Sequence, residues 1–298
     1  MQITLGWDTG CMNRAQIALD RLVRGIEAEG LGADGAHVLI GDNAAAHRWT
    51  PDVRIDIQSV AKGVCVLAAG IAADEGAFDL DAPVAAYLPD FELGAGVDAV
   101  TTRHLLRMSS GIDLPWSETM FEDWPDLARE FLGRPSRGRV FQYSNASTYT
   151  AMRALGSVVG DVHAYLEPRL FARLGIADAE WDRCPLGFIR AGGGLHLTMD
   201  EMARLGRLIR DRGEWDGRAL VSSGWIDAMH SDWVERDAGP GYERYALAGW
   251  GGPYDAWRLH GAYGQLLVFR GDAVVTLTAH DHIGGDRMAA LAVGSLAD

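Results

Sequence analysis

Cysteine, long apolar runs and positive charge are all scarce in this sequence of 298 residues. Its 3 cysteines, Cys11, Cys65 and Cys184, are widely spaced and odd in number. They predict neither a disulfide framework nor a Cys-x-x-Cys metal site, and we expect reduced, mostly buried thiols. Acidic residues outnumber basic ones by 41 to 27, which gives a formal net charge of -14. Proteins that bind nucleic acid neutralise phosphates with clustered Lys and Arg, so we expect no nucleic-acid partner.

Signals for membrane insertion and export are also missing. No stretch approaches the roughly 18 uninterrupted apolar residues of a membrane-spanning helix. The first residues, MQITLGWDTGCMNR, lack the basic and then apolar pattern of a secretion signal. We therefore expect a cytoplasmic protein with no membrane partner. The composition, 48% hydrophobic and 23% charged, is that of a globular protein long enough for one large core or two that share a cleft.

The amino-terminal part predicts helices and strands in alternation. Residues 13–29 carry apolar side chains at helical spacing between a capping Asn and a Gly. Residues 36–42 are typical of a buried strand, and residues 53–59 alternate in the manner of a half-buried strand. Residues 60–76 are apolar at helical spacing and stop at a Gly. Ser59 therefore stands where a predicted strand gives way to a predicted helix.

The remaining sequence predicts a helical middle followed by a second α/β part. The middle contains a helix capped by Thr102, one from Ala146 onward, and one over residues 161–175. The expected later elements are a strand region at 187–198, a helix at 199–213, three β segments within 255–281 and a helix at 286–296.

This order predicts an α/β (α+β) fold with an insertion. We expect a mixed, mostly antiparallel sheet flanked by helices and interrupted by an all-helical domain. Residues 1–77 and 187–298 would form the α/β domain, and residues 78–186 the helical domain.

Ser59 and Lys62 form the first chemical feature, the sequence Ser-Val-Ala-Lys at a predicted helix start. A spacing of three residues puts the lysine amine on the same helix face as the serine hydroxyl. A serine hydroxyl needs a neighbouring base to take its proton, and a buried lysine with a depressed pKa can be that base. The positive end of the helix dipole would favour the anion formed during attack. The same residues also fit a serine that caps a helix beside a surface lysine.

The second feature is Tyr143-Ser144-Asn145, just before a predicted helix. A phenol beside a lysine amine can act as general base towards Ser59 and as general acid towards the leaving group. The Asn145 amide could hold Lys62 and the carbonyl side of a substrate. A packed tyrosine and a capping asparagine in a loop explain these residues equally well when they are taken alone.

The third feature is the sequence LHGAYGQ at residues 259–265, within a β run. Glycines inside a strand often mark the close approach of a ligand, and an edge strand presents free N–H groups. Such an N–H, paired with that of Ser59, would form an oxyanion hole. A glycine bulge is the alternative explanation.

Together, in this order and on these elements, the three features resemble the serine β-lactamase and penicillin-binding superfamily, in particular its class C-like branch. That branch has Ser-x-x-Lys at a helix start, Tyr-x-Asn at the edge of a helical domain, and a Lys-Thr-Gly or His-x-Gly type strand facing the serine. Residues 104–113 and 191–222 resemble the branch outside these motifs. The likeness extends from about Ala36 to the end of the chain.

The resemblance implies a β-lactamase/transpeptidase-like fold and a role for each matching residue. Ser59 would be acylated, Lys62 and Tyr143 would exchange its proton, and Asn145 would orient Lys62. No metal or organic cofactor would be required. The tight cluster from His280 to His282 carries metal-ligand side chains, but neighbours on a strand point to opposite faces, so we expect no metal there.

The strand motif differs from that of true β-lactamases. The resemblance implies oxyanion donors on the backbone of Ser59 and of Ala262, with Tyr263 as the alternative because the motif fits the strand in two registers. His260, beside Gly261, stands at or next to the place of a Lys that pairs with the carboxylate of the substrate. Without that Lys, hydrolysis of penicillins is not the expected task. Some of the tryptophans are also expected to line the substrate cleft, among them Trp116, Trp124, Trp181 and Trp250.

We therefore expect a serine hydrolase, an esterase or amidase, that cleaves a small-molecule ester or amide through an acyl-enzyme. The chain resembles β-lactamase-like esterases and the hydrolase of short nylon oligomers. One alternative is a transacylase or amide synthase of a biosynthetic pathway, which gives the acyl group to an amine or alcohol. A second alternative is a non-catalytic, sensor-like module that recognises penicillin.

Overall fold

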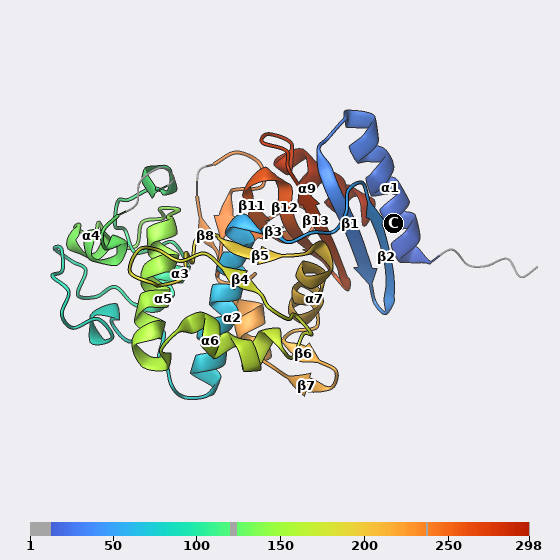
Figure 1. Cartoon of the computed structure of the whole chain (residues 1–298). Coiled ribbons are helices and arrows are strands. Elements are labelled where there is room, and N and C mark those ends of the chain that lie inside the picture. The colour runs from blue at the N-terminus through green and yellow to red at the C-terminus, as the bar shows by residue number, and fades with distance from the viewer. Residues whose placement is uncertain (1–12, 120–123, 237, 298) are drawn as a thin grey trace, which may run out of the picture.

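The computed structural model describes residues 13–119, 124–236 and 238–297, and its largest element is an eight-stranded sheet (Figure 1). The strands follow the spatial order β2-β1-β13-β12-β11-β10-β9-β8, and all neighbours pair antiparallel. Helices pack on this sheet, so the predicted fold class is confirmed. The strands of the large sheet are β1 Ala33–Ile40, β2 Asn43–Arg48, β8 Val234–Glu235, β9 Arg244–Tyr245, β10 Trp250–Gly251, β11 Trp257–Gly261, β12 Gln265–Arg270 and β13 Ala273–Ala279.

Helices lie on both sides of the sheet (Figure 1). Helices α1 and α9 pack together on one face, and α7 packs on the other face beside α2. As predicted, α1 begins after Asn13, whose side chain accepts the N–H of Ala15 at 2.9 Å, and it ends at Gly30 with a φ of 63°. The helices are α1 Arg14–Glu29, α2 Ala61–Asp74, α3 Thr102–Leu106, α4 Leu127–Gly133, α5 Asn145–Val159, α6 Val162–Leu166, α7 Met199–Arg210, α8 Ser223–Ala228 and α9 Gly285–Ser295.

Strand β12 shows why the central strands are continuous apolar runs. Leu266 and Val268 point into the core under α1 and α9. Leu267 and Phe269, which alternate with them, point into the core that contains α2 and α7. Fully burying such a side chain contributes about 1.5–3 kcal/mol. The central strands, buried on both faces, form the frame on which the candidate site is built.

The predicted strand at residues 53–59 is much shorter than expected. Only Ile55–Asp56, strand β3, pairs with β5 (Leu195–Leu197), which also pairs with β4 (Glu180–Trp181). The extended backbone ends at Gln58, whose φ of 53° lies in the left-handed region. Ser59 therefore follows a sharp turn. A separate hairpin joins β6 (Glu214–Trp215) to β7 (Arg218–Ala219).

Between residues 78 and 179, the part of the chain that the structure describes forms helices and loops. Its apolar side chains join the same core as α2 and one face of the large sheet. The prediction that Thr102 caps α3 is wrong by one residue. Thr101 is the cap, because its hydroxyl accepts the N–H of His104 while the His104 ring accepts the N–H of Thr101.

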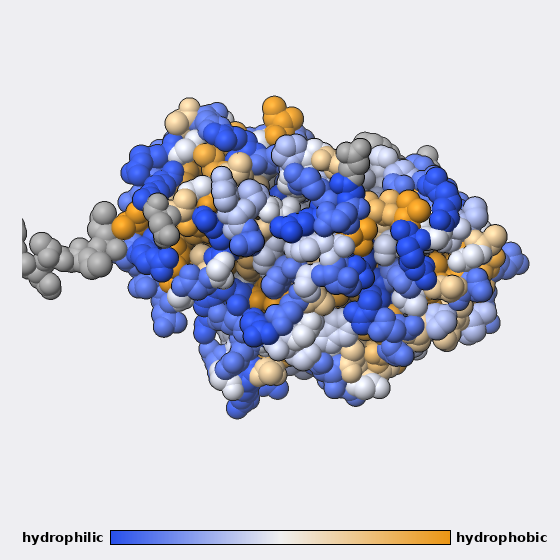
Figure 2. All heavy atoms as spheres, turned by 180° about the vertical axis from the view of Figure 1, so that it is seen from behind, coloured by the Kyte–Doolittle hydropathy of each residue, from blue (hydrophilic) through white to orange (hydrophobic). Residues whose placement is uncertain are grey.

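Within the described ranges, no helix has the length and apolar character needed to cross a membrane. Seen from the side opposite Figure 1, hydrophilic residues cover most of the visible surface (Figure 2). Apolar residues form small groups scattered among them. This distribution is ordinary for a folded chain, because polar side chains are too few to cover the whole surface.

Candidate active site

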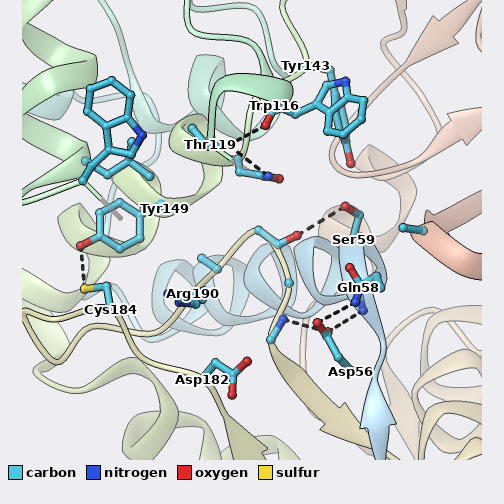
Figure 3. A pocket seen from close by; sticks show the side chains of 18 of the residues that line it. Asp56, Gln58, Ser59, Trp116, Thr119, Tyr143, Tyr149, Asp182, Cys184 and Arg190 are labelled. Carbon is cyan, nitrogen blue, oxygen red and sulfur yellow. Dashed lines mark hydrogen bonds between the residues drawn. The ribbon is translucent and has the colours of Figure 1, made fainter. Parts of the chain in front are cut away.

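The candidate active site is a cavity of about 570 Å³ between the turn that carries Ser59, the helical segment and the end of β11 (Figure 3). Ser59, Tyr143 and Asn145 line it, together with Ala262 and Tyr263. The three predicted features, which are far apart in the sequence, therefore meet at one cavity.

The cavity has an aromatic wall and a polar wall. Trp181 and Trp250, two of the tryptophans expected at the cleft, are instead only 5% and 4% exposed and lie in the core. The polar wall contains Asp56, Asp182 and Arg190 (Figure 3). The aromatic and apolar wall is formed by Trp116, Trp124, Leu127 and Tyr149.

Ser59 lies in a short 3-10 turn that leads directly into α2. A Cβ on Gly261 would lie 2.6 Å from the carbonyl oxygen of Ile57, so only glycine lets the end of β11 approach this turn. Further along α2, a Cβ on Gly63 would collide with the side chain of Leu259. Two glycines therefore set how closely β11 packs against the Ser59 turn and α2.

Lys62 is 2% exposed, and its amine donates to three oxygens. These are Ser59 Oγ at 2.8 Å, Asn145 Oδ1 at 2.8 Å and the carbonyl oxygen of Gly192 at 2.7 Å. Burial lowers the pKa of Lys62 from 10.5 to about 7, and nearby acidic groups oppose this shift only in part. An appreciable fraction of Lys62 is therefore uncharged at neutral pH and able to take a proton.

Tyr143 points its hydroxyl towards Ser59 (Figure 3). The Lys62 amine lies 5.0 Å from the centre of its ring. Tyr245 and Trp250 hold the same ring, at centroid distances of 5.9 and 5.4 Å. Burial raises the pKa of Tyr143 to about 12, and its hydrogen bond to Ser59 acts in the opposite direction. Tyr143 therefore keeps its proton at neutral pH and is suited to donate it.

Asn145 begins α5 and connects Lys62 to the helical segment. Its Nδ2 donates to Thr119 Oγ1 at 3.3 Å, which leaves Oδ1 to accept from Lys62. The Gly192 backbone packs against this amide so closely that a Cβ there would lie 2.7 Å from Asn145 Oδ1. The predicted orientation of Lys62 by Asn145 stays a prediction, but the contact that it requires is present.

Gly192 was not recognised from the sequence as a site residue. Its carbonyl accepts from the Lys62 amine, and Ser59 Oγ lies 3.4 Å from the same oxygen. The run Gly-Gly-Gly at 192–194 was the available signal, because consecutive glycines often mark close backbone approach. The run lies within the strand region predicted at residues 187–198, whereas β5 begins only at Leu195.

Both candidate oxyanion donors of the strand lie at the cavity. Ala262 and Tyr263 directly follow β11 in a 3-10 turn and line the cavity with Ser59. Tyr263 has a φ of 63°, so the chain turns sharply between the two residues. The backbone N–H groups of Ser59 and of Ala262, or alternatively Tyr263, remain the predicted donors.

His260 is not among the residues that line the cavity. Leu259 and Gly261 pack towards α2 and the turn that carries Ser59, so strand alternation directs His260 to the opposite face of β11. There Arg258 Nε donates to His260 Nδ1 at 2.9 Å, and the Tyr242 hydroxyl lies 3.5 Å from the same nitrogen. Burial lowers the pKa of His260 to about 4, so the imidazole is neutral at physiological pH. This placement favours a supporting role over contact with a substrate carboxylate.

The cysteines and the cluster from His280 to His282 were the other candidates for disulfide or metal chemistry. Cys65 is buried and Cys184 is half-buried at the cavity, and neither forms a disulfide; Cys11 lies outside the described residues. In the cluster from His280 to His282, the Asp281 carboxylate accepts backbone N–H groups of its own loop and of Gly32. Over the ranges that the structure describes, no group of three or more His, Cys, Asp or Glu side chains could hold a metal ion.

The sequence matches a known family model and curated relatives. The Beta-lactamase family model matches residues 20–292. The 6-aminohexanoate-dimer hydrolase of Paenarthrobacter ureafaciens is 31% identical over 207 residues, which cover 61% of this chain and 52% of that protein. The chain therefore spans about half the length of this curated relative.

Solved structures with the same fold cover nearly the whole chain. A class C beta-lactamase superposes with a TM-score of 0.75 at 16% identity, covering 96% of this chain and 97% of that one. A penicillin-binding protein homologue from Caulobacter crescentus superposes with a TM-score of 0.71 at 19% identity, covering 96% and 98%. At such identities the likeness shows the fold alone, and it agrees with the class C-like resemblance seen in the sequence.

Proposed function

Because the chain belongs to the β-lactamase family, we propose that it is a serine hydrolase that cleaves an ester or amide bond through an acyl-enzyme on Ser59. One observation carries the proposal: a buried lysine with a pKa of about 7 lies 2.8 Å from the hydroxyl oxygen of Ser59. A surface lysine beside a helix cap, the alternative explanation of the motif, would be exposed and would have no reason for such a pKa.

The proposed first step is attack by Ser59 on a carbonyl carbon. As the bond from Oγ to that carbon forms, the hydroxyl proton moves to neutral Lys62, and the carbonyl electron pair moves onto its oxygen. Backbone N–H groups of Ser59 and of Ala262 or Tyr263 would stabilise this oxyanion, aided by the N-terminus of α2.

In the second step the tetrahedral intermediate collapses. Tyr143 donates its proton to the leaving oxygen or nitrogen as the bond to that atom breaks, and Lys62 returns a proton to the phenol. Water then attacks the ester of Ser59, and the same groups carry the protons in reverse. The low pKa of Lys62 and the high pKa of Tyr143 support this division of labour.

An amide is the substrate that we favour over an ester. One curated relative is named 6-aminohexanoate-dimer hydrolase, and the bond that joins two 6-aminohexanoate units through amine and carboxylate is an amide. In this chain, the aromatic wall with Trp124 and Leu127 could bury an aliphatic chain, while the polar wall could bind a charged end.

The decisive experiment combines active-site labelling with turnover. A fluorophosphonate should add one label to the intact protein, and Ser59→Ala should abolish both this mass increment and the hydrolysis of p-nitrophenyl esters and linear amides. Undiminished turnover by Ser59→Ala would refute the mechanism. Transfer of the acyl group to an added amine, without free acid as product, would instead identify a transacylase.

A further inference from the structure

Asp56 ends β3 three positions before the nucleophile, and its carboxylate joins two separate segments. Oδ1 accepts the backbone N–H of Gln58 at 2.7 Å and that of Gly194 at 2.8 Å. Oδ2 accepts from the Gln58 side-chain amide at 2.7 Å. A single side chain therefore ties the nucleophile turn to the glycine run at 192–194 (Figure 3).

The bonds to Gln58 support an unfavourable backbone conformation. Gln58 has a φ of 53°, which residues with a Cβ adopt only when their surroundings compensate for the strain. Asp56 supplies this compensation through a side-chain to backbone bond across two residues. Ser59 follows directly, so relaxation of Gln58 would move the nucleophile.

The bond to Gly194 acts on the other reactive group. Two residues earlier in the same run, the Gly192 carbonyl accepts from the Lys62 amine at 2.7 Å. The hydrogen bonds of Asp56 therefore affect the position of Ser59 through Gln58, and the position of the Gly192 carbonyl, which contacts Lys62, through the glycine run.

We propose that Asp56 is a positioning residue of the hydrolase. Its carboxylate keeps the Ser59 hydroxyl and the Gly192 carbonyl within hydrogen-bond distance of the Lys62 amine. Its effect on turnover rests on the proposed function. Its effect on Lys62 is independent of turnover and is measured separately.

Asp56 also influences Lys62 through its charge. The titratable groups that face the amine are Asp56 from β3, Cys65 from α2 and Tyr143 ahead of α5. Burial raises the pKa of Cys65 and of Tyr143, so both are neutral. Burial also raises the pKa of Asp56, but its oxygens accept from three N–H groups, an arrangement that suits the ionised form. Its negative charge raises the pKa of Lys62 against the effect of burial.

The test compares Asp56→Asn with Asp52→Asn. Asp52 is a matched control, because its carboxylate also accepts two backbone N–H groups, those of Met199 at 2.7 Å and Asp200 at 3.2 Å, yet it does not line the cavity. Lys62 is the only lysine of the chain, so ¹³C-lysine labelling gives one side-chain signal whose titration reports this amine alone.

Asp56→Asn should lower the midpoint of the Lys62 titration by about one pH unit, because an attractive charge is lost. It should also reduce kcat by roughly tenfold or more with little change in KM, because misplaced reactive groups affect the chemical step. Asp52→Asn should change neither quantity. An unchanged midpoint and an unchanged kcat in folded Asp56→Asn would overturn the proposal.

Two further results distinguish the effect of Asp56 on Lys62 from a loss of folding and from a failure of the proposed function. If Asp56→Asn does not fold, the variant with Gln58→Gly added is examined, since glycine adopts a φ of 53° without support. The double variant should fold and show the lowered Lys62 midpoint, and a midpoint equal to that of wild type would overturn the proposal. If wild type hydrolyses no ester or amide but Asp56→Asn still shifts the midpoint, the electrostatic interaction of the Asp56 carboxylate with Lys62 stands and the proposed function fails.

Discussion

The carbonyl oxygen of Gly192 lies 2.7 Å from the amine of Lys62, although neither Ser-x-x-Lys nor Tyr-x-Asn includes this residue. In the protonated form of Lys62, the carbonyl accepts one of the three N–H groups, and Ser59 Oγ and Asn145 Oδ1 accept the other two. Because this contact is made by a backbone atom, the position of the carbonyl oxygen depends on the path of the glycine run. A sequence motif defined by side chains does not predict it.

Gly192→Ala should lower kcat by roughly 100-fold, because the added Cβ would press on the Asn145 amide and displace the Gly192 carbonyl. Gly224→Ala, a helical glycine with open space around its Cβ position, is the control and should retain the wild-type rate. Steady-state kinetics on one ester substrate provide the measurement. Equal rates for both variants would show that the contact with Asn145 is not critical.

The rate should depend on the protonation of Lys62. A pKa of about 7 means that kcat/KM rises with pH through about 7, since only the neutral amine accepts the Ser59 proton. The midpoint of the kcat/KM profile should coincide with the midpoint of the ¹³C signal of Lys62. A value of kcat/KM that stays constant over about two pH units on each side of this pKa would exclude Lys62 as the base.

Lys62 should also affect stability with a defined sign. Its folded pKa of about 7 lies below the unfolded value of 10.5, so the unfolded chain binds the proton more tightly between these values. The charged amine therefore opposes folding fully below pH 7, and this penalty declines as pH rises, by about 1.4 kcal/mol per unit. The free energy of unfolding of wild type, measured against Lys62→Met in urea, should rise from pH 7 to 10. A falling difference would contradict the assigned pKa.

Tyr143→Phe should reduce kcat by roughly 100-fold, because the ring is kept but the proton donor to the leaving group is lost. The loss should be smaller for p-nitrophenyl esters than for amides, since nitrophenolate leaves without protonation. Tyr245→Phe is the matched control: its buried hydroxyl has no hydrogen-bond partner among the residues that the structure describes, so its removal should leave the rate unchanged. Similar losses for esters and amides would argue against Tyr143 as general acid.

The parts of the fold that the sequence predicted are those with strong local signals. Helix α1 begins after Asn13 and ends at Gly30, as predicted. The Asn13 side chain accepts a free N–H of the first turn, and Gly30 adopts the left-handed conformation that ends the helix. The long central strands followed from their apolar runs. Short strands such as β8 to β10 were not predicted, because two-residue strands depend on neighbours that are distant in the sequence.

The candidate site shows the same limit. Ser59, Lys62, Tyr143 and Asn145 could be proposed from motifs, because their side chains have chemistry that a sequence displays. Gly192 contributes only a carbonyl group, which every residue has, so its part depends on tertiary structure. The direction of His260 likewise required the observed packing of β11.

The segments that line the cavity include β3, the turn that carries Ser59, α5, the glycine run and the end of β11, and they meet only when the helical segment rests on the sheet. No continuous short piece of the chain carries all of these groups. Catalytic activity should therefore report on the intact tertiary structure, and in a denaturant titration it should vanish no later than the secondary structure does. A fragment that keeps the Ser-x-x-Lys segment but lacks the last strands would retain Ser59 and Lys62 and lose the backbone of Ala262 and Tyr263 that lines the cavity with Ser59.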